Sequence, residues 1–183
     1  LFKRFADVDA IDLELDTEDP EAFINAVALM EPSFGGINLE DIKAPECFII
    51  DQALRERMKI PVMNDDQHGT AIISSAALLS ALEIVGKKIE EVILVVNGAG
   101  AAAVSCTKLY FALGLKKENL IMCDSKGVIN MERENLDESK KQFATTRKIK
   151  TLSEAVKGCD VFVGLSVADS LTPEDVLSMA NDP

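Results

Sequence analysis

The sequence predicts an α/β protein whose larger part is a parallel, doubly wound sheet with helices on both faces. Segments rich in β-branched residues alternate with helical segments along the chain, and this order is typical of parallel sheets. A glycine-rich turn at residues 98–103 joins one strand directly to the next helix. Hydrophobic residues make up 48% of the 183 residues and charged residues 27%, which indicates a folded domain rather than disorder.

The first part of the chain carries four segments with recognisable patterns. Residues 5–15 alternate apolar and acidic side chains, which predicts a strand, and residues 19–32 have apolar residues at helical spacing and a proline near their start. Residues 44–59 predict a second helix, and residues 60–65 a short buried strand. The residues expected to share one face of the second helix are Cys47, Phe48, Ile49, Leu54 and Met58.

The second part of the chain predicts a regular alternation of helices and strands. A long helix is expected from Thr70 to Gly86, because a glycine followed by two lysines is typical of a helix C-terminus. A β-branched strand follows over residues 91–97, and an apolar helix follows the glycine turn. Two later strands are expected to end at Asp124 and at Ser166.

The remaining segments are a charged connection and a final helix. Residues 131–150 are rich in charge and predict a solvated helix or loop. The final helix has a strong start signal, with Thr172 as N-cap, Pro173 at the first helical position and Asp175 as the capping partner.

Composition and charge limit the organisation of the chain and its partners. We expect a first domain over residues 1–67 and a second, C-terminally incomplete domain over residues 68–183. The formal net charge of −12 argues against nucleic acid or an anionic membrane as a partner. The four cysteines form no CxxC pair and indicate reduced, largely buried thiols. No signal peptide is visible, and the apolar stretches stop short of the roughly 18 residues of a membrane span, so a soluble cytoplasmic protein is expected.

The glycine turn is a strong functional signal in the sequence. Its residues are Gly98, Ala99, Gly100, Ala101, Ala102 and Ala103, a GxGxxA that follows a strand and opens a helix. In such turns the glycines permit a tight bend and close approach of a pyrophosphate to the backbone. Asp124 ends the next strand, where an acceptor for ribose hydroxyls is expected, whereas Lys126 could meet a 2′-phosphate. The pattern predicts NAD or NADP, and a tight turn without a ligand is the alternative.

Two pairs of adjacent acids, Glu40–Asp41 and Asp65–Asp66, suggest a cation site. Neighbours on a helix or strand point apart, so each pair can share a cation only at a turn or at the end of an element. The acids are either in the first turn of a helix, where its dipole favours them, or oxygen ligands for Mg²⁺ or Mn²⁺. His68, the single histidine, is either a general base or ligand, or a hydrogen-bonded turn residue, which we favour.

Five segments together point to a family. In chain order they read FGGINLEDIKAPECF, PVMNDDQHGTA, VVNGAGAAA, CDSKGVI and CDVFVGLSVADSLT. In sequence and spacing they resemble the bacterial-type malic enzymes over essentially the whole chain. The resemblance implies oxidative decarboxylation of malate to pyruvate and CO₂ with reduction of NAD or NADP, dependent on Mg²⁺ or Mn²⁺, in a homodimer or higher oligomer. It also implies a parallel Rossmann-type NAD(P)-binding domain preceded by part of an α/β substrate and metal-binding domain.

The resemblance assigns metal and catalytic roles to acids of this sequence. The residues that would hold the divalent metal are Glu40, Asp41 and Asp66. Asp65 would support the hydrogen-bond network of a catalytic lysine. That lysine and a tyrosine acid would lie upstream of Leu1, and the asparagines that hold malate downstream of Pro183.

The resemblance also assigns the cofactor contacts. Residues 98–102 would hold the pyrophosphate, Asp124 the adenosine ribose, and Ser166 and Val167 would lie along the path to the nicotinamide ribose. Asn97 and the alanine-rich turn depart somewhat from the family pattern. Two alternatives stay open. The chain could be a metal- and dinucleotide-binding fragment without turnover, or another Rossmann oxidoreductase of hydroxy or amino acids, which would have no divalent-metal site.

Overall fold

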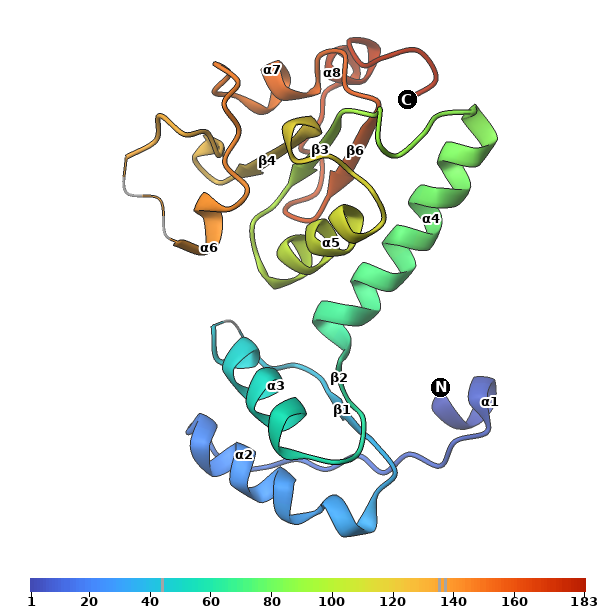
Figure 1. The fold of residues 1–183 in the computed structure, drawn as a ribbon, viewed down its shortest axis with the longest axis vertical. Coiled ribbons are helices and arrows are strands. Elements are labelled where there is room, and N and C mark those ends of the chain that lie inside the picture. Colours follow the sequence, from blue (N-terminus) through green and yellow to red (C-terminus); the bar gives the residue numbers. More distant parts are fainter. Residues whose placement is uncertain (44, 135, 137) are drawn as a thin grey trace. The chain divides into compact units, whose positions relative to one another are not determined.

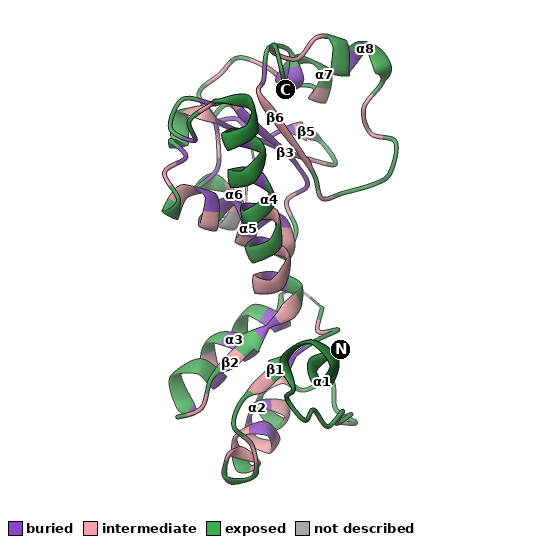
Figure 2. Cartoon of the chain, turned by 90° about the vertical axis from the view of Figure 1, so that its right-hand side faces the viewer, coloured by how far each residue is buried: buried purple, intermediate pink, exposed green. Residues whose placement is uncertain are grey.

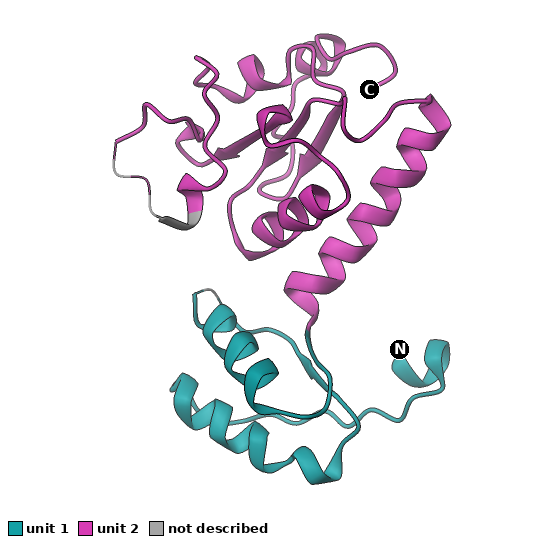
Figure 3. Ribbon diagram, viewed as in Figure 1, with its two compact units in different colours: residues 1–63 teal, residues 64–183 magenta. Residues whose placement is uncertain are grey.

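A computed structural model of the chain (Figure 1) describes residues 1–43, 45–134, 136 and 138–183. The chain forms two compact units, Leu1–Met63 and Asn64–Pro183 (Figure 3). Each unit has buried hydrophobic clusters of its own. The division into domains after residue 67 stays a prediction.

The first unit packs two helices beside a small sheet. Its elements are α1 (Phe2–Ala6), α2 (Pro20–Leu29), the 3₁₀ turn η1 (Glu31–Ser33), β1 (Ile37–Leu39), α3 (Glu46–Arg57) and β2 (Val62–Asn64), whose last residue begins the second unit. β1 and β2 pair with each other. The predicted helix over residues 19–32 is confirmed, with Pro20 in the first turn and the Asp19 carboxylate accepting a hydrogen bond from the Glu21 amide.

Two predictions for this unit are wrong. Residues 5–15 form no strand, because no other segment of the described chain pairs with them and nearly all of their side chains are exposed. On α3, Phe48 and Ile49 are exposed, whereas Cys47 and Leu54 are buried. The buried face follows Cys47, Ile50 and Leu54 at helical spacing, which turns the two residues after Cys47 toward the outside.

The second unit contains a four-stranded sheet in the order β5-β4-β3-β6. Its strands are β3 (Leu94–Asn97), β4 (Leu120–Asp124), β5 (Gly127–Val128) and β6 (Val161–Gly164). β3 lies in the centre and is parallel to both β4 and β6, while β5 runs antiparallel to β4. The chain therefore builds first on one side of β3 and then on the other, and ligands bind at the carboxyl ends of parallel strands where this reversal occurs. The parallel sheet is confirmed, although β6 ends at Gly164 rather than at Ser166.

Helices cover both faces of this sheet. The helices and helical turns of this unit are the π-helical turn η2 (Asp65–Gly69), α4 (Thr70–Val85), α5 (Ala101–Ala112), the 3₁₀ turn η3 (Lys117–Asn119), α6 (Glu138–Lys141), α7 (Leu152–Val156) and α8 (Pro173–Leu177). Leu94 and Val96 of β3 pack in one cluster with α4 and α5, whereas Val95 packs in a second cluster with α7. Figure 1 shows these helices around the sheet. The predicted end of α4 at Gly86 and the capping box of α8 are confirmed.

One helix among the described residues, Asp65–Val85, is long and apolar enough to cross a membrane by length and composition alone. The expectation that every apolar stretch stops short of that length is wrong for this helix. Ala71, Leu78 and Leu82 nevertheless lie in the same core cluster as β3, and the outer side of the helix is exposed (Figure 2). A core helix passes the same test as a membrane span, so this feature is weak evidence for a membrane.

Candidate functional site

The glycine turn lies at the carboxyl end of β3, between the ends of β4 and β6. The Gly98 amide donates a hydrogen bond of 2.9 Å to the Cys123 carbonyl, and the Leu165 amide donates one of 2.8 Å to the Asn97 carbonyl. Gly98 has a φ of 138°, and a β-carbon there would collide with the backbone of Leu165. Glycine at this position is therefore required by the close approach of the turn to the segment that leaves β6.

Gly100 differs, because nothing in the fold demands a glycine there. Its φ of −85° is open to any residue. A β-carbon on it would meet no atom within 4 Å. Gly100 is the N-cap of α5, and no side chain of the described residues caps this helix, so none of them occupies its first amides. A smooth backbone beside uncapped amides fits the pyrophosphate of a dinucleotide.

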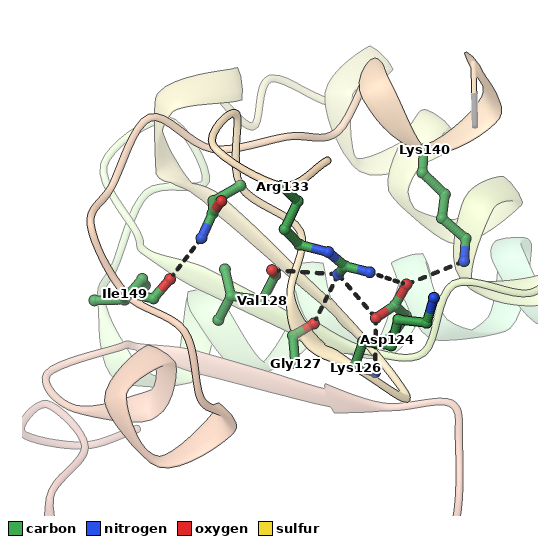
Figure 4. A network of polar contacts seen from close by, with 8 residues as sticks. Asp124, Lys126, Gly127, Val128, Arg133, Lys140 and Ile149 are labelled. Atoms are coloured by element: carbon green, nitrogen blue, oxygen red, sulfur yellow. Dashed lines mark hydrogen bonds and ion pairs between the residues drawn. The ribbon is translucent and has the colours of Figure 1, made fainter. Parts of the chain in front are cut away.

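Asp124 sits beside this turn at the end of β4, and its carboxylate is surrounded by donors (Figure 4). Oδ1 accepts hydrogen bonds of 2.9 Å from the Lys126 amide and 2.9 Å from Nη1 of Arg133. Oδ2 accepts bonds of 3.1 Å from Nη2 of Arg133 and 3.0 Å from Nζ of Lys140. Burial alone would raise the pKa of Asp124, but the Arg133, Lys126 and Lys140 donors outweigh it and lower the pKa to about 2.

Arg133 and Lys140 are site residues that the sequence reasoning missed. Nη1 of Arg133 also points to the carbonyls of Gly127 and Val128, so the guanidinium joins β4, β5 and the loop that follows them (Figure 4). Both residues come from the charged segment that was predicted to be a solvated helix or loop. The one signal for them is the group of basic residues that follows Asp124 in the sequence.

Ser166 and Val167 are exposed and follow β6 at the same edge of the sheet as the glycine turn. The structure thus brings the predicted cofactor residues of the second unit to one edge, at the carboxyl ends of β3, β4 and β6. Their individual contacts with a cofactor stay predictions.

The pair Glu40–Asp41 lies in a turn directly after β1. Asp41 has a left-handed φ of 57°, and Oε2 of Glu40 accepts a hydrogen bond of 3.3 Å from Nδ2 of Asn38. The next helix, α3, begins only at Glu46. The interpretation of this pair as a helix start is therefore wrong. Both acids are exposed at a turn, where neighbouring carboxylates are able to face a common ion.

The pair Asp65–Asp66, in contrast, does lie in the first turn of a helix. Both residues belong to η2, which leads into α4. The side chain of Asp65 lies against Gly69, where a β-carbon would collide with its carboxylate, and Asp66 is exposed. Among the described residues no three His, Cys, Asp or Glu side chains form a group that could hold a metal. The predicted metal set draws on both units and stays a prediction.

The turn before α4 also fixes the single histidine. Nδ1 of His68 accepts a hydrogen bond of 3.3 Å from the Asn64 amide, and Oδ1 of Asn64 accepts one of 3.2 Å from the Gln67 amide. The prediction of a hydrogen-bonded turn residue is confirmed. Nδ2 of Asn64 and Nε2 of Gln67 are buried without a hydrogen-bond partner in the described part of the chain. A buried donor without a hydrogen-bond partner costs about 1–3 kcal/mol, and such donors are rare in folded proteins.

Comparison with known proteins agrees with this arrangement. Residues 67–182 match the family model of the malic enzyme NAD binding domain, and residues 11–55 match that of the malic enzyme N-terminal domain. The NADP-dependent malic enzyme of Salmonella typhimurium is 57% identical over the whole chain, which covers 24% of that relative, and that of Halomonas elongata is 54% identical, with 43% covered. The crystal structure of the NAD-dependent malic enzyme from Thermotoga maritima matches with a TM-score of 0.90 at 44% identity, over 98% of this chain and 48% of that one.

The chain thus spans between about a quarter and a half of the length of these relatives. The model of the malic enzyme NAD binding domain alone covers more than half of the residues of this chain. The chain belongs to the malic enzyme family.

Proposed function

We propose that this chain supplies the dinucleotide-binding site and part of the metal site of an enzyme that oxidatively decarboxylates malate to pyruvate and CO₂. The observation that carries the proposal is Gly100, a glycine without a conformational or packing reason in the fold, at the uncapped start of α5. A tight turn without a ligand would explain Gly98 but not Gly100. Two relatives that match the whole chain are named NADP-dependent and NAD-dependent malic enzymes.

Different residues bind the dinucleotide and the metal ion, according to the chemistry of their groups. The amides at the start of α5 bind the pyrophosphate, and Ser166 and Val167 border the path toward the nicotinamide ribose. Glu40, Asp41 and Asp66 offer carboxylate oxygens, which suit Mg²⁺ or Mn²⁺. When bound, NAD or NADP supplies the hydride acceptor and the divalent ion supplies a Lewis acid.

Asp65 acts through another group rather than on malate. Its carboxylate lies beside Gly69 in η2. We assign it the role of positioning the proton-transferring lysine that the family resemblance places outside this sequence. The proposal further takes malate and pyruvate as substrate and product, a homodimer or higher oligomer, and a cytoplasmic location.

The experiment that tests the metal site is a calorimetric titration of Mn²⁺ in the presence of NADP or NAD. We compare the unchanged chain with Asp66→Ala and with Glu83→Ala, a matched control that removes an exposed acid from α4. We expect Mn²⁺ binding to be lost in Asp66→Ala and kept in Glu83→Ala. Equal Mn²⁺ binding by all three proteins would exclude Asp66 as a ligand. Binding of dinucleotide without any Mn²⁺ binding would favour another Rossmann oxidoreductase.

A further inference from the structure

Gly69 is a glycine that its own backbone conformation does not require. It lies inside the continuous helix Asp65–Val85, with a φ of −62° and a ψ of −51°, which any residue adopts. Glycine inside a helix is destabilising relative to alanine, because it loses more conformational freedom on folding. A residue that weakens a helix and is not needed for the helix geometry therefore has another reason to be there.

The reason lies in the space beside Gly69. A β-carbon at this position would collide with Oδ1 of Asp65 and crowd Cγ of the same side chain. Residues four apart lie on the same face of a helix, so the Asp65 carboxylate lies back against the glycine. Asp65 is half-buried in this position, whereas the next residue, Asp66, is exposed. The turn thus gives two adjacent acids different surroundings.

Capping of the helix does not explain the position of the Asp65 carboxylate. The N-cap is Asn64, whose Oδ1 accepts a hydrogen bond of 3.2 Å from the Gln67 amide. In the described part of the chain no hydrogen bond or ion pair involves the Asp65 carboxylate. Its acceptor positions are therefore open to a donor from outside the described residues. The turn itself is π-helical, a rare conformation that often occurs at functional sites.

We infer that Gly69 is a positioning residue, which leaves the space that holds the Asp65 carboxylate against the turn and so keeps Asp65 from acting as a metal ligand beside Asp66. The inference rests on the proposed function and deepens it, because it explains how two adjacent acids take different roles. Asp65, held against its own helix, is preorganised to orient the proton-transferring lysine. Asp66 stays exposed to a divalent ion.

The substitution Gly69→Ala should move the Asp65 carboxylate without unfolding the chain. The atoms that the new β-carbon would meet belong to the end of a flexible side chain, which reaches another position by rotation about χ1. Once displaced, the carboxylate would become a second exposed acid beside Asp66, within reach of the same divalent ion. The expected signature is a change in accessibility and in metal contact rather than a loss of the fold.

The test labels the carboxylates of the 183-residue chain with a water-soluble carbodiimide and an amine, and peptide fragmentation by mass spectrometry gives a rate for each acid. In the unchanged chain we expect Asp65 to react several-fold more slowly than Asp66. In Gly69→Ala the two rates should become similar. The matched control Gly35→Ala, whose β-carbon meets no atom within 4 Å, should leave both rates unchanged. Added Mn²⁺ should protect only Asp66 in the unchanged chain, but both acids in Gly69→Ala.

A double variant separates the contact with Asp65 from the effect of the glycine itself. Asp65→Ala/Gly69→Ala removes the carboxylate that the new methyl group would meet, so only the gain in helix stability remains. In urea unfolding we expect this variant to raise the folded-to-unfolded ratio of Asp65→Ala by up to about fivefold, and Gly69→Ala alone to gain less. If neither Gly69→Ala nor the double variant folds, the fold itself requires Gly69 and the inference is wrong.

The labelling rates also distinguish this inference from the proposed function. An unchanged rate for Asp65 in Gly69→Ala would overturn the inference, and so would protection of Asp65 by Mn²⁺ in the unchanged chain. A lack of Mn²⁺ protection at Asp66 would instead count against its metal role, which belongs to the proposed function. The rates measured without metal would then still decide whether Gly69 holds the Asp65 carboxylate in place.

Discussion

At the scale of single residues, the two acids that matter most to the site have opposite surroundings. Asp124 is nearly buried, and its carboxylate accepts one hydrogen bond from a backbone amide and three from side chains. Asp66 is exposed. The donors around Asp124 stabilise its ionised carboxylate in the fold, whereas the exposed position of Asp66 suits the metal-binding role proposed for it. We therefore expect a substitution of Asp124 to change the stability of the fold, and a substitution of Asp66 to change the affinity for a metal ion.

The first prediction concerns Asp124→Asn and pH. The native pKa of Asp124, about 2, lies below its ordinary value of 3.8, so this carboxylate stabilises the fold above pH 3.8 and the contribution is lost as the pH falls toward 2. The shift corresponds to about 2 kcal/mol. We expect Asp124→Asn to lower the free energy of unfolding by at least that amount at pH 7, because Arg133 and Lys140 lose their counter-charge.

Urea unfolding at a series of pH values checks this prediction. The difference between the unchanged chain and Asp124→Asn should shrink below about pH 4. Glu83→Gln, at an exposed acid of α4, should follow the unchanged chain at every pH. A difference that stays constant down to pH 2 would show that the ion pairs with Arg133 and Lys140 do not stabilise the fold.

At the scale of elements, the turn from β3 to α5 contains two glycines with different roles: Gly98 is required by the fold, and Gly100 is proposed to allow the ligand to approach. We predict that Gly98→Ala destabilises the chain, because its φ of 138° disfavours alanine and the new β-carbon meets the Leu165 backbone. Gly100→Ala should change the free energy of unfolding by no more than about 1 kcal/mol, since it alters only an N-cap, but should weaken NADP binding more than tenfold.

Thermal unfolding and calorimetry on the same samples separate these effects. Gly35→Ala is the matched control, because a β-carbon at Gly35 also meets nothing within 4 Å and lies in the first unit. This variant should change neither stability nor NADP binding. Full NADP affinity in Gly100→Ala would remove the observation on which the proposed function depends.

The elements also show which structure the sequence could predict. The capping box of α8 and the glycine end of α4 were predictable because they depend on residues within one turn of each other. Thr151 and Glu154 form a capping box of the same kind at the start of α7, and the same local pattern in the sequence indicates it. Residues 5–15 have the period of a strand, but a strand also needs a partner, which a local pattern does not reveal.

The residues of the candidate site likewise fall into those that the sequence predicts and those that it does not. Gly98, Gly100 and Asp124 are predictable because a strand, a turn and a helix fix their places within a short stretch of sequence. The contacts of Arg133 and Lys140 with Asp124 are not predictable in this way, because the partners lie 9 and 16 residues apart in the sequence and no local pattern indicates their pairing. The left-handed backbone conformation of Asp41 is likewise not predicted by any local sequence pattern.

At the scale of the whole molecule, the chain consists of two units of unequal size. Among the described residues, the first unit, Leu1–Met63, has one core cluster, which includes Leu54. The second unit, Asn64–Pro183, packs clusters on both faces of its sheet. The fraction of surface that a domain buries rises with its length, so the second unit gains more from burial. We therefore expect the two units to differ in stability.

The four cysteines report on this difference, because all are buried and none forms a disulfide. Cys47 belongs to the first unit, and Cys106, Cys123 and Cys159 belong to the second. Burial raises the pKa of Cys123 to about 12 and that of Cys159 to about 11, so these thiols stay protonated and slow to react while the fold is intact. Each thiol becomes reactive only when its own unit opens.

The last prediction is that Cys47 reacts with a thiol reagent at a lower urea concentration than the other three cysteines. Brief labelling across a urea series, followed by peptide mass spectrometry, gives a midpoint for each residue. We expect one midpoint for Cys47 and a higher, shared midpoint for the second unit. A Cys47→Ser variant should leave that higher midpoint in place if the units unfold separately. A single midpoint for all four thiols would instead mean that the two units unfold as one cooperative structure, with the smaller one stabilised by the larger.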